Sequence, residues 1–240
     1  MQIFAATDQG KVRTNNEDFV CWDVARGLAV LADGMGGLNA GEIASEVAAT
    51  SAMKVLHQQT DCQEVSEQSR LLIEAINTAN EAVFELSSTR YDYQGMGTTL
   101  VVSRVVGDTC FVAHVGDSRI YRYANGQLEQ VGQDHSVVQQ LVNEGLLTPE
   151  KARHAPNRNI ITRAVGINEC VESESNQVAL AKGEMVILCS DGLSDMVEDR
   201  IIQNACTRLA REPEKLPGEL IRLANERGGI DNISVIVLTR

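Results

Sequence analysis

The sequence predicts an α+β fold in which two antiparallel sheets pack face to face and helices cover their outer faces, a four-layer α-β-β-α sandwich. Two long amphipathic helical patterns follow one another, and the strands after them are joined by short turns, so strands and helices do not alternate strictly. Each helix has one apolar stripe that a sheet can cover. A chain of 240 residues with 43% hydrophobic side chains can bury one substantial core, so we expect a single domain over residues 1–240.

Short apolar or alternating runs bounded by turn residues predict nine strands. Turns such as Val106-Gly107-Asp108 and Ala124-Asn125-Gly126 connect several of them. In chain order, the predicted strands are Ile3 to Thr7, Phe19 to Trp22, Leu28 to Ala32, Thr98 to Val105, Thr109 to Val115, Arg119 to Tyr123, Val171 to Ala179, Met185 to Cys189 and Ile233 to Leu238.

Helices are predicted where apolar residues recur at helical spacing. The polar stretch from Gln133 to Arg163 carries weaker strand signals, and we expect an irregular helical insertion there. In chain order, the predicted helices span Gly41 to Gln58, Glu67 to Ser87, His135 to Glu144, Glu198 to Arg208 and Leu216 to Arg227.

Charge and composition exclude several classes of partner. The chain has 21 basic and 33 acidic side chains, a net charge of -12, and no basic cluster, so we expect neither nucleic acid nor an anionic membrane as a partner. The six cysteines are widely spaced and form no C-x-x-C pair, which is typical of reduced thiols. The start of the chain lacks a signal pattern, and no apolar run reaches the ~20 residues of a membrane span. We therefore expect a cytoplasmic protein and, without a heptad pattern, a monomer.

Four apolar strands carry an aspartate at one end. LAVLAD ends on Asp33, FVAHVGD ends on Asp117, MVILCSD ends on Asp191, and Asp231 introduces the last strand. Each of them alone is explained as a turn or cap residue. If the strand ends meet in one cleft, the carboxylates repel one another unless cations neutralise them. Oxygen ligands without histidine or cysteine favour Mg²⁺ or Mn²⁺, and Gly34 leaves room beside Asp33 for an ion and a substrate.

The glycine-rich turn after Asp33 does not match a nucleotide-binding loop. Asn39 stands where the dinucleotide fingerprint requires glycine or alanine, and no P-loop is present. C-x5-R, D-x-D, H-E-x-x-H and G-x-S-x-G are also missing from the sequence, which leaves metal-activated water as the chemistry. Arg13 precedes two acids in RTNNED and can hold two phosphate oxygens, although an ordinary exposed loop explains those six residues equally well.

Seven motifs occur in an order that is similar to a known family. They are RTNNED, ADGMGG, GMGTTL, HVGDSR, DHS, CSDGL and GGIDNISVIV. With these motifs the sequence closely resembles the protein phosphatase 2C family of metal-dependent serine/threonine phosphatases, especially its compact bacterial catalytic domains. The resemblance covers nearly the whole chain, from ATDQG at residues 6–10 to the final strand. It implies a two-metal site at one end of the sandwich and a flap-like insertion around residues 134–166 beside that site.

The resemblance implies a role for each acid of the core site. Asp33 is implied to bridge two Mn²⁺ or Mg²⁺ ions, Gly34 to offer its carbonyl oxygen, and Asp191 and Asp231 to bind one of the ions. Arg13 matches the arginine that binds the phosphate. We expect Asp33 and Arg13 to carry the catalysis.

Further residues around the site are implied by the same resemblance. Asp18 and Glu17 would act mainly through metal-bound waters, and Asp117 together with Asp191 could hold a third, weaker ion. Three more residues match supporting positions, for which an ordinary place in a strand or turn is the better explanation: Thr98, Thr99 and Asn232.

The sequence departs from the family pattern at two positions. Some relatives have a histidine directly after the Asp-Gly pair, where this chain has Met35, and many bacterial relatives have a histidine where this chain has Leu38. Methionine cannot donate a proton, so the general acid is unassigned and metal-bound water is the default donor. His114 and His135 match motif positions, and for each we expect a structural hydrogen bond rather than a catalytic role.

The expected reaction is the hydrolysis of phosphoserine and phosphothreonine in proteins phosphorylated by a serine/threonine kinase. A water that bridges the two ions attacks directly, and no phosphoenzyme forms. One alternative is a catalytically weak phosphoprotein-binding domain of the same fold, which would be expected to lose ligand acids. Another is a metal-dependent nuclease or small-phosphoester hydrolase, which would need a basic groove or a set of stacking aromatic residues, whereas only 4% of the residues are aromatic.

Overall fold

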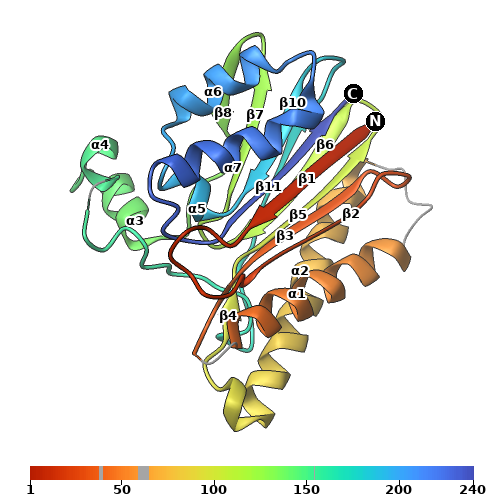
Figure 1. Ribbon diagram of the computed structural model, residues 1–240. Helices are drawn as coiled ribbons and strands as arrows, with labels where there is room; N and C mark the ends of the chain where they lie inside the picture. Colours follow the sequence, from red (N-terminus) through yellow and green to blue (C-terminus); the bar gives the residue numbers. More distant parts are fainter. Residues whose placement is uncertain (38–39, 59–64, 154) are drawn as a thin grey trace.

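Two antiparallel sheets pack face to face in the computed structural model, which describes residues 1–37, 40–58, 65–153 and 155–240 (Figure 1). The first sheet has the strand order β1-β11-β10-β7-β8, and the second has the order β2-β3-β5-β6-β9 with the short β4 paired to β3. Neighbouring strands run antiparallel throughout both sheets. The chain termini lie together, because β1 and β11 are neighbours.

The strands of the first sheet are β1 (Gln2–Asp8), β7 (Arg119–Ala124), β8 (Gln127–Gln130), β10 (Met185–Cys189) and β11 (Ile233–Thr239). Those of the second sheet are β2 (Asp18–Asp23), β3 (Leu28–Met35), β4 (Gly97–Thr98), β5 (Leu100–Val106), β6 (Thr109–Val115) and β9 (Glu174–Ala179).

Helices cover the outer face of each sheet, which confirms the predicted four-layer architecture. Helices α1 (Ala40–Gln58) and α2 (Val65–Thr89) pack on the second sheet, and α6 (Asp199–Arg208) and α7 (Leu216–Glu226) pack on the first (Figure 1). Three α-helices are short: α3 (Val137–Asn143), α4 (Pro149–Ala152) and α5 (Asp191–Ser194), the last of which begins two residues after β10 ends. Helices α3 and α4 belong to an insertion that stands to one side of the sandwich, and we call its described residues, 134–153 and 155–166, the flap.

Alternation along the strands divides the apolar residues between three layers of core. On β3, Leu28 and Val30 face α1 and α2, whereas Ala29 and Leu31 face the other sheet. The same alternation on β10 and β11 sends every second residue into the layer between the sheets. A side chain at the end of a strand therefore points to the same face as the residues two and four positions before it.

The observed elements differ from the predicted ones in a few places. Strand β8 was not predicted, because its segment QLEQ carries no apolar alternation. The strand predicted from Thr98 to Val105 is divided at Thr99 into β4 and β5, and the helical turns α4 and α5 were also missed. The strand predicted from Val171 begins only at Glu174. Leu38 lies outside the described residues.

Among the described residues, every helix is too short or too polar to span a lipid bilayer.

Candidate active site

Two aspartates of the second sheet face each other at the end of the sandwich. Asp33 on β3 and Asp18 on β2 are directly opposite partners in the antiparallel ladder. Asp33 follows Ala29 and Leu31 at steps of two, so its side chain points between the sheets, and Asp18 has the same parity as Val20. Only 8% of Asp18 is exposed, so it lies behind Asp33 rather than on the surface.

The first sheet contributes acids at the same end. Asp191 opens α5 one residue after Ser190 and two residues after β10 ends, and Asp231 stands two residues before β11 begins. Strands β10 and β11 are neighbours, so the two acids come from adjacent strand ends. A cleft of about 240 Å³ brings together most of the predicted site residues: Arg13, Glu17, Asp33, Gly34, Thr99, Asp117, Asp191 and Asp231. Met35 also lines this cleft, whereas Asp18, Thr98 and Asn232 lie behind its wall.

Burial and neighbouring charges raise the pKa values of four aspartates at this end of the sandwich. Burial and the neighbouring charges of Asp18 and Asp191 hold the pKa of Asp33 well above its usual range, and burial with the charge of Asp117 does the same for Asp191. Burial raises the pKa of Asp18 to about 6, and burial together with Asp134 raises that of Asp117 to about 7. So many acids in one buried place are stable as carboxylates only when cations accompany them.

Hydroxyl groups hold the backbone of Asp33 in place. The Oγ1 of Thr99 accepts the N–H of Asp33 at 3.1 Å and lies 2.7 Å from the hydroxyl of Ser118. The Oγ1 of Thr98 donates to the carbonyl oxygen of Asp33 at 2.8 Å. Both threonines are nearly inaccessible to solvent. The break between β4 and β5 therefore has a structural reason, since the backbone turns there to support Asp33.

Asn232 fastens the loop that carries Arg13 and Glu17. Its Oδ1 accepts the backbone N–H of Glu17 at 2.8 Å, and its Nδ2 donates to the carbonyl oxygens of Gln9 and Asn15 at 2.9 and 2.8 Å. The side chain is 4% exposed, so all these bonds are made away from solvent. This places Asn232 as the structural support of the loop.

Ser190 is a site residue that the sequence did not reveal. It is fully buried, and its hydroxyl donates to Oδ2 of Asp18 at 2.8 Å, while the Oγ of Ser190 itself accepts the N–H of Ser234 at 2.9 Å. The other carboxylate oxygen of Asp18, Oδ1, is buried and has no hydrogen-bond partner among the described residues. A serine beside a strand end is an ordinary residue, so only the fold shows that Ser190 orients Asp18.

Arg13 lies at the rim of the cleft and is 45% exposed. Its NH2 group donates to Oδ2 of Asp231 at 2.8 Å, which ties the predicted phosphate-binding residue to a predicted metal ligand. The other nitrogens of the guanidinium make no hydrogen bond to the described residues, so they are free to receive an anion.

Gly34 is required by close packing as well as by any role at a metal. Its N–H donates to the carbonyl oxygen of Glu17 at 3.1 Å, and a Cβ at this position would collide with the backbone carbonyl of Gly41. Any other residue would push α1 away from β3 and so displace Asp33.

The two histidines of the motifs make backbone hydrogen bonds, as expected. His135 Nδ1 accepts the N–H of Gly116 at 3.1 Å, and His114 Nε2 lies 3.0 Å from the carbonyl oxygen of Gln133, which can only accept. In neutral His135 the proton is thus on Nε2, which lies 3.9 Å from Glu174. Although His114, His135 and Glu174 are close together, His135 would have to give up the Gly116 bond to offer Nε2 as a metal ligand.

The residues of the cleft fit divalent cations of the Mg²⁺ and Mn²⁺ type. The acids that line it offer only oxygen donors, and no histidine or cysteine stands among its described lining residues. The unpartnered Oδ1 of Asp18 and the raised pKa values of Asp33 and Asp191 indicate that positive charge is needed here.

Comparison with known proteins finds relatives that match this sequence along the whole chain. The family model for protein phosphatase 2C matches residues 9–215. The protein phosphatase PhpP of Streptococcus pneumoniae is 37% identical over 245 residues, which cover 100% of this chain and 97% of PhpP.

Solved structures agree with the fold. The serine/threonine phosphatase of S. agalactiae has a TM-score of 0.90 and 38% identity, with 100% of this chain and 99% of that chain covered. The catalytic domain of the serine/threonine protein phosphatase PstP, solved in complex with two manganese ions, has a TM-score of 0.84 and 36% identity, with 98% and 96% covered.

Proposed function

Since this chain belongs to the protein phosphatase 2C family and is a metal-dependent protein serine/threonine phosphatase, we propose that it hydrolyses phosphoserine and phosphothreonine by direct attack of water. The observation that carries this mechanism is the meeting of Asp18 and Asp33 from one sheet with Asp191 and Asp231 from the other, beside a half-exposed Arg13. The alternative of a weak phosphoprotein-binding domain predicted the loss of such acids, and they are all present.

The core ions are proposed to be held by Asp33, Asp191 and Asp231, with the carbonyl oxygen of Gly34 as a further ligand. Asp18 and Glu17 would bind the water molecules around them. Bound there, Mn²⁺ or Mg²⁺ would supply positive charge for the phosphoryl oxygens and lower the pKa of the attacking water. For a third, weaker ion the proposed ligands are Asp117 and Asp191, which both line the cleft.

The side chains of the cleft support direct hydrolysis rather than a covalent intermediate. Among the described residues that line it there is no serine, cysteine, histidine or lysine, and the hydroxyl of Thr99 is already held by Asp33 and Ser118. The carboxylates of the cleft could also act as nucleophiles, but in this proposal they are engaged with the ions and their water molecules. Met35 cannot donate a proton, so water is the proposed donor of the proton that the leaving serine or threonine alkoxide takes up. Arg13 positions the phosphate with the guanidinium nitrogens that Asp231 leaves free.

The protein acts on phosphorylated proteins, and we propose that a serine/threonine kinase produces them. We also propose that residues 1–240 form one catalytic domain with the flap as an insertion, that this domain is a monomer, and that it works in the cytoplasm without nucleic acid or membrane as partner. The five cysteines of the described chain are all free, which supports a reducing compartment.

An assay of a phosphothreonine peptide with Mn²⁺, with Mg²⁺ and with chelator tests this function. Asp33→Ala should leave a folded protein that retains less than about 1% of the Mn²⁺-dependent activity, because the proposed ions would lose a carboxylate ligand. Asp92→Ala, an exposed aspartate of the short helical turn at Tyr91–Tyr93, is the matched control and should be fully active. Full activity of Asp33→Ala after verified metal exchange would refute the assignment.

A further inference from the structure

A second cavity opens beside the catalytic cleft and lies under the flap. It has a volume of about 220 Å³ and adjoins the cleft, because Asp117, Asn159 and Asp191 line both. The flap forms one wall, and the segment from α5 to the start of α6 forms the other. A polypeptide whose phosphoresidue sits in the catalytic cleft can therefore place a neighbouring side chain in this cavity.

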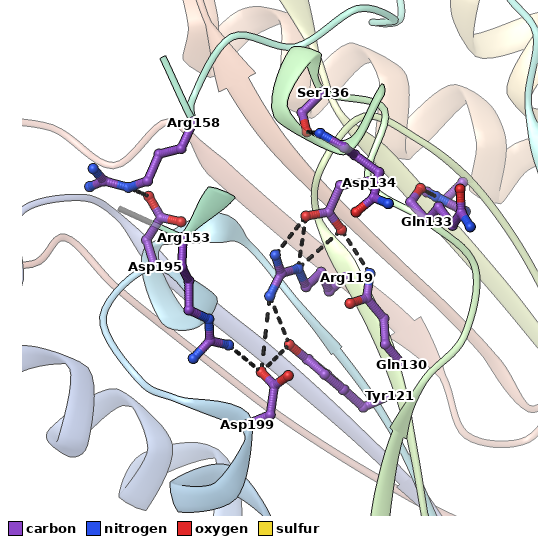
Figure 2. A network of polar contacts seen from close by, with 12 residues as sticks. Arg119, Tyr121, Gln130, Gln133, Asp134, Ser136, Arg153, Arg158, Asp195 and Asp199 are labelled. Carbon is purple, nitrogen blue, oxygen red and sulfur yellow. Dashed lines mark hydrogen bonds and ion pairs between the residues drawn. The ribbon is translucent and has the colours of Figure 1, made fainter. Parts of the chain in front are cut away.

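The innermost arginine of the cavity is fully occupied by protein groups. Arg119 makes three hydrogen bonds to the carboxylate of Asp134, between 2.6 and 3.0 Å, and one to the hydroxyl of Tyr121 (Figure 2). Arg119 and Asp134 are 18% and 12% exposed, so this pair is part of the wall and has little capacity for a ligand.

Two ion pairs cross the cavity from the flap to the opposite wall. Arg153 donates to Oδ1 of Asp199 at 2.8 Å, and Arg158 donates to Oδ2 of Asp195 at 3.0 Å (Figure 2). Both arginines are about one third exposed, and Asp199 is about half exposed, so each pair contributes only ~0.2–1 kcal/mol and can be opened by a competitor.

The aspartates of these pairs can accept more hydrogen bonds than the arginines of the flap donate to them. Oδ2 of Asp199 and Oδ1 of Asp195 receive no hydrogen bond from the described residues, since the bonds to Asp199 all converge on its Oδ1. Both carboxylates thus have a free oxygen on the wall that faces the flap.

The charge of the whole chain, rather than the balance inside the cavity, favours a cation. Five aspartates and three arginines line the cavity, and without Asp117 and Asp191, the proposed ligands of ions, three aspartates face three arginines. The whole chain has a net charge of -12, which draws basic segments toward it. An incoming carboxylate would instead face the free oxygens of Asp195 and Asp199.

We propose that this cavity binds a lysine or arginine side chain of the phosphoprotein substrate, close in sequence to the phosphorylated residue, with Asp199 and Asp195 as its acceptors. The proposal rests on the proposed function, because it requires that the phosphoresidue occupy the neighbouring cleft. Arg153 and Arg158 then act as internal competitors that hold the two aspartates until a basic side chain arrives. Specificity for basic substrates would be set by this flap contact and would be absent for a small phosphate ester.

The first experiment compares phosphothreonine peptides that differ at one position. Arginine, alanine or glutamate is placed in turn at each of the positions flanking the phosphothreonine, and kcat/KM is measured with the Mn²⁺-loaded enzyme. At one or two positions we expect arginine to raise kcat/KM about 5-fold over alanine, mainly through KM, and glutamate to lower it.

Two variants should move this preference in opposite directions. Asp199→Asn removes an acceptor and should reduce the arginine preference to about 2-fold or less, whereas Arg153→Gln removes the competitor and should increase it about 2- to 3-fold. Asp92→Asn removes an exposed aspartate elsewhere and should leave the preference unchanged. Hydrolysis of 4-nitrophenyl phosphate should be the same in all three, which shows that each variant is folded and binds metal.

The proposal is overturned if no position prefers arginine, or if glutamate is preferred and Arg153→Gln abolishes that preference, since the cavity would then be an anion site. An arginine preference that survives in Asp199→Asn and in Asp195→Asn also overturns it. If neither peptide nor 4-nitrophenyl phosphate is hydrolysed with Mn²⁺, it is the proposed function that has failed, and the two failures are therefore distinguishable.

Discussion

Ser190→Ala tests whether a residue outside the cleft controls the metal centre. The substitution removes the hydroxyl that donates to Oδ2 of Asp18 at 2.8 Å and leaves the N–H of Ser234 without its acceptor. Both groups are buried, so water cannot replace the lost bonds. A hydrogen bond to a carboxylate contributes about 1.5–3 kcal/mol and an unpaired buried N–H costs about 1–3 kcal/mol, so we expect the free energy of unfolding to fall by about 3 kcal/mol.

The effect on metal binding is the more specific part of this prediction. With one oxygen held by Ser190, the free Oδ1 of Asp18 is fixed in direction, and the same bond lowers the pKa of this carboxyl against the effect of burial. Without the bond, Asp18 gains a proton more easily and loses its orientation. Removing such an outer support of a metal site weakens metal affinity about 10- to 100-fold. We expect Mn²⁺ affinity, measured by titration calorimetry, to fall by about 10-fold.

Ser103→Ala is the matched control. Ser103 is also fully buried and donates to the carbonyl oxygen of Ala29 at 3.2 Å, four residues before Asp33 on β3. It should reduce stability in urea denaturation with chelator and leave Mn²⁺ affinity unchanged. Equal Mn²⁺ affinity in Ser190→Ala and the wild type, at a comparable loss of stability in both variants, would mean that the Ser190 hydroxyl serves packing alone.

Three further predictions concern the cleft. Asp191→Ala should abolish Mn²⁺-dependent hydrolysis of a phosphopeptide in a protein whose circular dichroism is unchanged, and retained activity would remove Asp191 from the metal centre. Arg13→Ala should raise KM for phosphopeptide more than it weakens Mn²⁺ binding, with less than about 1 kcal/mol lost in stability because its ion pair is half exposed; an unchanged KM would contradict the phosphate role. In chelator, the free energy of unfolding, measured by urea titration, should fall as pH rises from 5 to 7.5. Burial raises the pKa values of Asp18 to about 6 and of Asp117 to about 7. The folded state therefore holds protons that the unfolded state has released, and it loses stability as they dissociate. Burial lowers the pKa of His135 to about 4, so this residue opposes the trend below pH 6.5 without reversing it. A rise in stability over the whole pH range would contradict the predicted burial and repulsion of the aspartates.

The sequence predicted the architecture, and the aspartates at the strand ends, because both depend on local periodicity. The alternation of LAVLAD fixes the face on which Asp33 lies, whereas Asp18 was implied only by the family resemblance and is placed opposite Asp33 by the pairing of β2 with β3. The Asn125-Gly126 turn also carried a signal for the missed β8, since both residues have positive φ and such pairs close two-residue hairpins. Strand β8 was still not predicted, because its segment QLEQ is polar and has no apolar alternation.

The remaining parts of the site depend on contacts between distant segments, which periodicity does not encode. Ser190 and Asp18 are 172 residues apart in sequence, and Arg153 meets Asp199 across the cavity only because the flap stands beside α6. The support of Asp33 by Thr99 likewise requires the chain to leave β4 at that residue. Each of these residues is ordinary in its local sequence, so its role follows from the fold.

The position of the acids also bears on the stability of the sandwich itself. Asp18 and Asp33 belong to the second sheet, whereas Asp191 and Asp231 belong to the first, so the proposed ions would be bound by both sheets at once. Without them, the mutual repulsion of the ionised carboxylates destabilises the contact between the two sheets at this end. Metal binding should therefore stabilise the whole fold by mass action as well as activate water, and the dependence of unfolding free energy on Mn²⁺ concentration measures the first effect independently of catalysis.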